Sequence, residues 1–343
     1  MIEKYLNEII ASKKINEKNL TLFQWNKLFN KAKNQGLAPI FYIYFRESNV
    51  IPQFILLQAK KEYEDALIYK DYSISLLKEM AFDLCNAGKI ILIKGIALYE
   101  DIYKEPLMRT MSDIDLYIPN LNEKEIQKIL KKYGFTNYKN YKYLYSNNHI
   151  FIDIHTDLWG IRRIEARKYL CSQIEESYLP SKLIQGFYLL SNQLTAIYSA
   201  YHCVKHNFYK KIWIFDIVLE HKKGYFNDVD IKKIPYVGFV LNYLQNEKII
   251  NNDFILSGNL PKVKKIIFNK IASRNNISCL GEIALALSCP SLVKTFLYLV
   301  KTLFPSKSIL IEMYGKKPFC FLFLIRIFNL IKYFGEFILC PQK

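Results

Sequence analysis

The chain has 343 residues, of which 51% are hydrophobic and 23% are charged, and 48 Lys and Arg residues stand against 31 Asp and Glu residues, a formal net charge of +17. This composition excludes a disordered chain and allows two or three packed units. The charge favours polyanionic partners such as nucleotides, RNA, anionic lipid or phosphorylated sugars, with the alternative that a lysine-rich composition merely reflects an AT-rich genome.

The seven cysteines contain no C-x-x-C pair, and their odd number argues against a disulfide framework or a zinc site. We therefore expect reduced thiols and a cytoplasmic protein. The N-terminal segment has no apolar signal-peptide region. No membrane-spanning helix is expected from the sequence.

The first part of the chain, residues 1–88, is predicted to be helical. Apolar residues in the run 23–32 recur with the period of an α-helix, which places Trp25 and Leu28 in the core. A long helix is expected from Gln53 to about Cys85, with a glycine shortly after it as a C-cap.

A short apolar run, residues 90–93, predicts a buried strand that is closed by Lys94 and Gly95. Residues 96–103 then predict one or two helical turns. Proline lacks an amide N–H and clashes with the preceding turn, so Pro106 limits this helix.

A second strand is expected to begin at Asp113, and its alternation puts Asp113 and Asp115 on one face. Two carboxylates about 7 Å apart on a strand face repel each other, so the pair indicates a bound cation. Oxygen ligands suit Mg²⁺, which commonly binds one or two carboxylates together with substrate phosphates.

A third aspartate lies in the strictly alternating run 149–155, which predicts another strand of the same sheet. Its isoleucines face the core. Asp153 and His155 share the opposite face.

The order of strand, glycine turn, helix, D-x-D strand and later Asp-bearing strand resembles the polymerase-beta-type nucleotidyltransferase superfamily. The segments K-G-I-A-L, D-I-D-L-Y-I and F-I-D-I-H look closest to an uncharacterised bacterial branch of it, the NTP_transf_5 type, over residues 90–157. The resemblance implies an enzyme that moves NMP from an NTP to an unidentified acceptor, which could be a nucleic acid, a protein or a sugar. It also implies two Mg²⁺ ions, with Mn²⁺ as an alternative.

Within this resemblance the aspartates are the expected catalytic residues and metal ligands, with Asp113 and Asp115 on the nucleotide side and Asp153 on the acceptor side. Nucleotide binding is expected from Lys94 at the triphosphate, from Gly95 through close backbone approach, and from Arg109 and His155. Two structural alternatives stay open. Arg109 could form a surface ion pair with Asp101 or Glu105, and His155 could be a buried histidine bonded to backbone.

Two departures from the superfamily pattern leave other functions open. Ile96 stands where a second small residue is usual, and the gap from Gly95 to Asp113 is longer than the common one. A catalytically inactive nucleotide-binding module is therefore an alternative. A glycosyltransferase-like enzyme of surface-polysaccharide synthesis would also use D-x-D, but it needs a longer Rossmann-like half before that motif.

The predicted fold class is α+β, with a small mixed sheet flanked by helices. The predicted units are an N-terminal helical region at 1–88, a nucleotidyltransferase-like core at 89–160 and a C-terminal helical region at 161–343. The main helices expected after the D-x-D strand are Glu123–Lys132, Leu189–His206 and Ile212–His221.

Two further features of the C-terminal region bear on function. His202 and His206 are spaced as metal ligands could be, but we expect them to pack between helices and to bond Asp216. The apolar segment 318–340 is expected to pack against its own protein. The alternative is peripheral contact with an anionic membrane surface.

Overall fold

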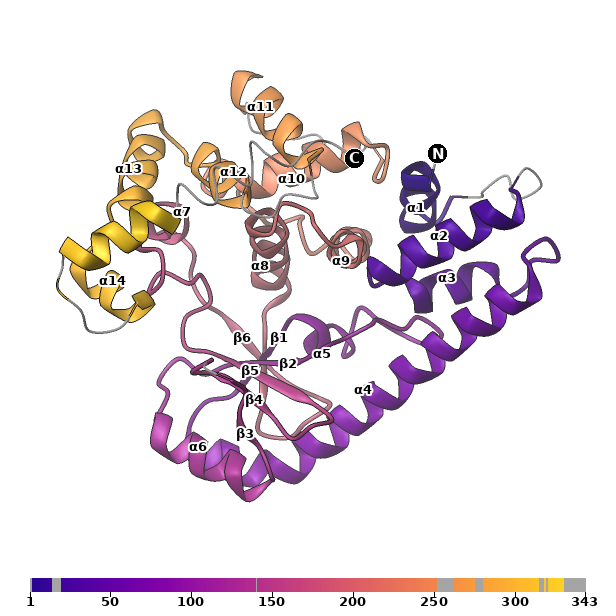
Figure 1. Cartoon of the computed structure of the whole chain (residues 1–343), viewed down its shortest axis with the longest axis horizontal. Helices are drawn as coiled ribbons and strands as arrows, with labels where there is room; N and C mark the ends of the chain where they lie inside the picture. Colours follow the sequence, from indigo (N-terminus) through magenta and orange to yellow (C-terminus); the bar gives the residue numbers. More distant parts are fainter. Residues whose placement is uncertain are drawn as a thin grey trace.

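The computed structural model describes residues 2–13, 20–139, 141–251, 262–274, 280–314, 318 and 320–329. Within these residues a seven-stranded mixed sheet lies among helices, as Figure 1 shows, and the α+β class is confirmed.

The chain alternates between helical stretches and short strands. In chain order the helices are α1 (Ile2–Ile10), α2 (Leu22–Asn34), α3 (Ala38–Phe45), α4 (Gln53–Ala87), α5 (Lys94–Leu98), α6 (Glu123–Lys132), the 3₁₀ helix η2 (Glu165–Arg167), α7 (Lys168–Cys171), α8 (Asn192–Lys205), α9 (Lys211–Lys222), α10 (Pro235–Asn246), α11 (Lys262–Ala272), α12 (Leu280–Leu287), α13 (Leu292–Leu303) and α14 (Lys307–Tyr314). The strands are β1 (Ile91–Ile93), β2 (Ile114–Tyr117), β3 (Thr136–Asn137), β4 (Leu144–Ser146), β5 (Phe151–His155), β6 (Tyr178–Pro180) and β7 (Tyr188–Leu190).

The strand order is β3-β4-β5-β2-β1-β7-β6. β1 is antiparallel to β2, and β2 is parallel to β5. This pairing brings Asp115 opposite Asp153 and Tyr117 opposite His155. The central pair of strands therefore carries acidic residues from two distant parts of the chain on one face of the sheet.

The sheet continues beyond residue 160, into the region that the sequence predicts to be helical. β7 pairs in parallel with β1, and β6 pairs with β7. Leu189 consequently lies in a strand, and the helix expected to begin there starts at Asn192. Short apolar runs do not distinguish a buried strand from the start of a buried helix, which explains this error.

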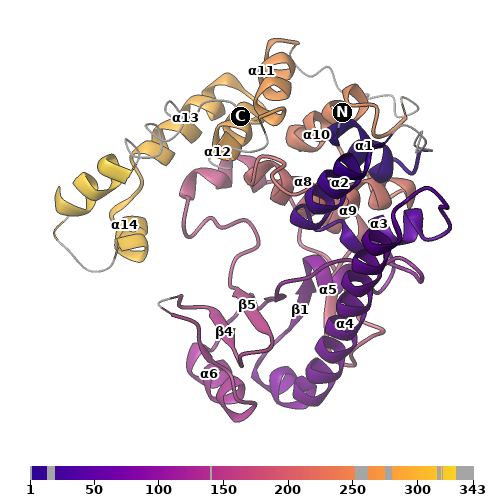
Figure 2. The same cartoon turned by 45° about the vertical axis from the view of Figure 1, so that its right-hand side comes forward.

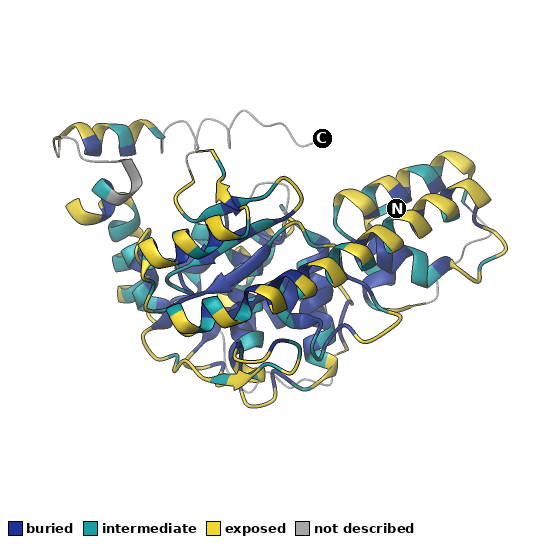
Figure 3. Ribbon diagram, turned by 90° about the horizontal axis from the view of Figure 1, so that it is seen from below, coloured by how far each residue is buried: buried dark blue, intermediate teal, exposed yellow. Residues whose placement is uncertain are grey.

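The two faces of the sheet pack against different helices. On one face, Leu116 and Ile152 are fully buried together with Leu77 of α4 and Leu130 of α6. On the other face, apolar residues such as Ile93 join a larger core that includes α8 and α9. Figure 3 shows the resulting pattern, with buried strands inside and exposed residues on the outer sides of the helices.

The predicted long helix is confirmed as α4, which belongs to both cores. Ile55 near its start packs with the N-terminal helices, and Leu84 near its end packs under the sheet. Trp25 and Leu28 are buried as expected. Gly88 follows the helix with an extended backbone, φ 160°, so it ends the helix without a left-handed cap.

Only part of the apolar segment 318–340 lies in the described residues, where 320–329 are helical. Leu322 is buried there, whereas Leu324 and Phe328 are exposed, so the expected packing against the protein holds for one side of this helix. Among the described residues, no helix has the length and apolarity required to cross a membrane.

Candidate active site

Three side chains of kinds that can bind a metal ion lie close together on the face of the sheet that is turned toward α8. The register of β2 and β5 brings Asp115 beside Asp153, and His155 lies two residues further along the same face. Nε2 of His155 is 2.8 Å from Oδ1 of Asp115 and 3.2 Å from Oδ2 of Asp153. One ligand atom from each of the three residues lies within 4.8 Å of the other two. As predicted, two strands that are far apart in the sequence thus bring their carboxylates into one acidic group.

Lys94 supplies the positive charge of this group. It follows β1 with a left-handed backbone, φ 54°, and its ammonium donates a hydrogen bond to Oδ1 of Asp115. The same Nζ lies 3.3 Å from Nε2 of His155. Burial alone would raise the pKa of the Asp115 carboxyl, but the Lys94 charge and the His155 hydrogen bond hold it below its ordinary value. Asp115 is therefore a carboxylate at neutral pH.

Asp113 is placed differently from Asp115. β2 begins at Ile114, so Asp113 lies just outside the strand and outside the three-residue ligand group. Its Oδ1 accepts a hydrogen bond of 2.9 Å from the Ser112 hydroxyl. Burial, and then the nearby Asp115 charge, raise the pKa of Asp113 to about 6. The predicted like-charge interaction between the two aspartates exists, and the metal role of Asp113 stays a prediction.

Gly95 occupies a crowded position at the start of α5. A Cβ at this residue would lie 2.7 Å from Nη1 of Arg109 and 3.0 Å from Sδ of Met111. A larger residue here would displace the Arg109 and Met111 side chains of the loop before β2, a packing role that the sequence did not reveal. α5 ends at Leu98 and is shorter than the predicted 96–103, and the phosphate role of Gly95 stays a prediction.

Arg109 forms a buried ion pair that neither interpretation of the sequence anticipated. Its Nε lies 3.0 Å from Oδ1 of Asp216, and its Nη2 lies 2.9 Å from Oδ2 of the same carboxylate. The Tyr103 hydroxyl donates to Oδ1 of Asp216 at 2.6 Å. The alternative of a surface pair with Asp101 or Glu105 is wrong, because the partner of Arg109 is Asp216 on α9. This geometry pairs the guanidinium with a carboxylate of the protein itself. Contact between the guanidinium and a phosphate stays a prediction.

The two histidines of α8 pack against each other and against an indole. The His202 and His206 rings are 4.7 Å apart, and they lie 4.6 Å and 5.2 Å from the Trp213 ring. Asp216 instead accepts from Arg109 and Tyr103, so the expected histidine bond to Asp216 is absent from the described residues. Burial, and then the Lys205 and Lys94 charges, lower the pKa of His206 to about 3.

Tyr198 of α8 is a neighbour of the acidic group that the sequence interpretation missed. Burial, opposed by the Lys94 charge and supported by the charges of Asp115 and Asp153, raises its pKa to about 12. Its ring packs edge-on against Trp159 at 5.9 Å. The only sequence signal for Tyr198 is its helical period, which predicts packing and gives no link to strands far earlier in the chain.

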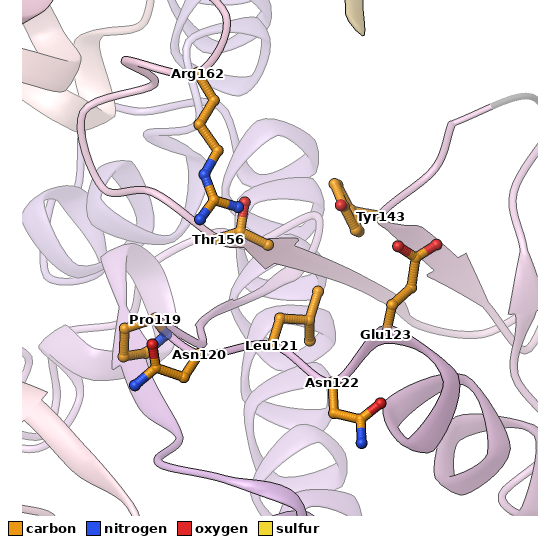
Figure 4. A pocket seen from close by; sticks show the side chains of 8 residues that line it. All are labelled: Pro119, Asn120, Leu121, Asn122, Glu123, Tyr143, Thr156 and Arg162. Carbon is orange, nitrogen blue, oxygen red and sulfur yellow. The ribbon is translucent and has the colours of Figure 1, made fainter.

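A separate pocket of about 430 Å³ opens at the carboxyl ends of β2 and β5. Figure 4 shows Arg162 extending toward the hydroxyl of Thr156, with Glu123 across the pocket. The eight lining residues do not include the aspartates of the ligand group. They are Pro119, Asn120, Leu121, Asn122, Glu123, Tyr143, Thr156 and Arg162.

Comparison with known proteins identifies the family of the chain. A family model, NTP_transf_5, described as an uncharacterised nucleotidyltransferase, matches residues 21–232, which is more than half of the chain. The chain belongs to this family. The matched span extends from α2 through the whole sheet to α9, and so includes both sides of the acidic group. No curated protein and no solved structure matches the chain.

Proposed function

We propose that this nucleotidyltransferase-family protein is an Mg²⁺-dependent enzyme that transfers NMP from an NTP to an acceptor. The observation that supports the proposal is the meeting of Asp115, Asp153 and His155, with the Lys94 ammonium bonded to Asp115. Family membership supports the reaction class, and the geometry supports the residues.

The donor set fits a divalent cation. Two carboxylates and one imidazole lie close enough to share an ion, and the Lys94 ammonium already balances part of their charge. Mg²⁺ prefers oxygen ligands, which Asp115 and Asp153 would supply together with Asp113, whereas a nitrogen ligand from His155 would suit Mn²⁺ better. When bound, the ion would lower the pKa of the acceptor hydroxyl and stabilise charge on the leaving pyrophosphate.

The remaining residues of the site bind the NTP and orient the carboxylates. His155 lies within hydrogen-bonding distance of both carboxylates and so fixes their separation before substrate arrives. With the Asp115 charge balanced by a divalent ion, the Lys94 ammonium becomes available to a phosphate oxygen of the NTP. The buried surroundings of this ammonium strengthen such a contact, because charges interact more strongly in a medium of low dielectric constant.

The exposure of the two carboxylates is consistent with a division of roles. The Asp115 side chain is 5% exposed and the Asp153 side chain is 34% exposed. We assign Asp153 to the acceptor, which must enter from solvent, and Asp115 with Asp113 to the nucleotide. An Asp153→Ala variant should then retain NTP binding by calorimetry but lose turnover. Equal loss of NTP affinity in Asp153→Ala and Asp113→Ala would contradict this assignment.

The direct test is labelling. The protein is incubated with each NTP labelled at its α-phosphate, with Mg²⁺ or Mn²⁺, and with cell extract as the source of acceptor. We expect one extract component to acquire label in a metal-dependent manner, and Asp115→Asn to abolish the labelling. Asp71→Asn, at an exposed aspartate on α4, is the matched control.

Two outcomes would favour the alternatives. Metal-dependent NTP binding without label transfer or pyrophosphate release would favour an inactive binding module. Transfer of a sugar from a sugar nucleotide would favour the glycosyltransferase alternative. The fold gives that alternative no support, because β1 is the only strand before β2 in the described residues.

A further inference from the structure

The outer face of α13 carries a row of exposed apolar side chains. Leu292 is 77% exposed and Phe296 is 65% exposed. Leu299 and Leu303 are also exposed and follow at seven and eleven residues from Leu292, a spacing that places all four on one face of a helix. Monomeric soluble proteins rarely leave such a contiguous apolar row in water.

This exposure does not come from a loosely attached helix. On the inner face of α13, Tyr298 is fully buried and donates to Oε2 of Glu282 at 2.7 Å. Glu282 also pairs with Arg167 of η2. The helix is therefore held by polar contacts on one side and presents its apolar side outward.

Two adjoining helices carry further exposed apolar side chains. The 320–329 helix exposes Leu324 and Phe328, and its Arg326 donates to the Thr302 carbonyl of α13 at 2.7 Å. At the other end, α11 exposes Val263 and Ile266. Lys264 of α11 donates to the Thr295 hydroxyl of α13 at 3.1 Å, which keeps these two helices together. We call the exposed apolar side chains of these three helices the C-terminal apolar surface: Val263, Ile266, Leu292, Phe296, Leu299, Leu303, Leu324 and Phe328. In Figures 1 and 2, α13 and α14 lie at the edge of the molecule, away from α4 and α6.

The charge around this surface is strongly positive. The described residues from 262 to 329 contain nine Lys and Arg residues and two glutamates. One of those glutamates, Glu282, is already engaged by Arg167 and Tyr298. On α11, the exposed Lys262 and Lys270 lie on the same face as Val263 and Ile266 by helical spacing.

We propose that the C-terminal apolar surface binds the face of an anionic lipid bilayer. Apolar side chains enter the boundary between head groups and acyl chains, while the lysines contact the head groups. A twelve-residue helix such as α13 is about 18 Å long and lies in the interface, because a hydrocarbon core is about 30 Å thick. A second copy of the chain fits this surface poorly, because two surfaces of the same positive charge would face each other.

Vesicle flotation of the full-length protein tests the proposal. Vesicles of phosphatidylcholine alone are compared with vesicles that also contain phosphatidylglycerol, at low and at high salt. We expect flotation with the anionic vesicles, weakened by salt. Phe296→Asp should reduce binding by about tenfold or more, because one large apolar side chain no longer enters the bilayer.

The matched control is Phe82→Asp, which alters a phenylalanine on α4 that is 77% exposed and lies outside this surface. This control should bind vesicles like the wild type. Both variants replace exposed residues, so circular dichroism and thermal melting should show an unchanged fold. The double variant Lys262→Glu/Lys270→Glu should weaken binding to anionic vesicles without removing an apolar contact.

Several results would overturn the proposal. These are the absence of flotation with anionic vesicles, equal flotation of wild type and Phe296→Asp, and concentration-dependent dimerisation that Phe296→Asp abolishes. The last result would assign the surface to a second copy. None of these measurements depends on nucleotidyl transfer, because no residue of the acidic group is changed.

Discussion

The two faces of the central sheet come from the same strands and have opposite properties. In β2, Leu116 is buried between the sheet and the helices α4 and α6, while the adjacent Asp115 belongs to the acidic group on the other face. In β5, Ile152 and Asp153 divide in the same manner. Since side chains alternate along a strand, each carboxylate is placed by the buried residue next to it.

The difference between the two faces explains how the aspartates are positioned precisely. A slip of one residue between β2 and β5 would turn aspartates away from Lys94 and into the apolar core against α4 and α6, at a large cost in free energy. The apolar face of the sheet, which packs against α4 and α6, therefore fixes the register. That register brings Asp115 opposite Asp153 although the two residues are far apart in the chain.

The largest expected effect lies on the acidic face. Asp115→Asn should reduce nucleotidyl transfer by about a thousandfold or more, which corresponds to about 4 kcal/mol of transition-state stabilisation. It should also lower the free energy of unfolding, because the buried Lys94 ammonium loses its counterion. The double variant Lys94→Met/Asp115→Asn should recover stability but not transfer, as measured by urea unfolding and by the labelling assay. Recovery of transfer would contradict the role of Asp115.

The next effect concerns the ion pair that ties the loop before β2 to α9. Asp216→Ala should cost about 3–5 kcal/mol of stability, because the Arg109 guanidinium would remain buried without its partner. Chemical unfolding measures this loss. The paired variant Arg109→Met/Asp216→Leu should recover most of it. If that recovered variant keeps normal NTP binding, the predicted phosphate contact of Arg109 is wrong.

On the apolar face of the sheet, which packs against α4 and α6, the expected effect is on stability alone. Leu116→Ala should cost about 2–5 kcal/mol through lost burial and the cavity left behind. Transfer per folded molecule should stay near that of the wild type at low temperature. Urea unfolding and active-enzyme titration separate the two quantities. A large fall in turnover without a fall in stability would show that the two faces are not independent.

The smallest expected effect at neutral pH is a pH dependence that originates in α8. His206 has a pKa of about 3 in the folded protein, below the ordinary histidine value of 6.5. As pH falls below 6.5 the unfolded chain takes up this proton first, so stability decreases down to about pH 3 and is unaffected by this group above pH 6.5. His206→Asn should flatten the dependence by up to about 1.4 kcal/mol per pH unit, less where solvent reaches the ring. Unfolding at several pH values measures this, and His149→Asn, at an exposed histidine, is the control.

Sequence patterns were most informative where alternation and glycine signals were strong. The long helix α4, the helix Glu123–Lys132 and the shared face of Asp153 and His155 follow from local periodicity. The pairing of Arg109 with Asp216 and the place of Tyr198 could not be predicted in this manner. They depend on how α8 and α9 pack against the sheet, and local periodicity contains no information about such long-range contacts.

The parallel pairing of β7 with β1 has a practical consequence for dissecting the protein. A fragment that stops at residue 160 would lack β7 and would leave the backbone N–H and C=O groups of β1 unpaired along one side. Unpaired edges of apolar strands join those of other molecules and form aggregates. A soluble minimal fragment of the sheet should therefore continue past Leu190, where β7 ends and covers β1.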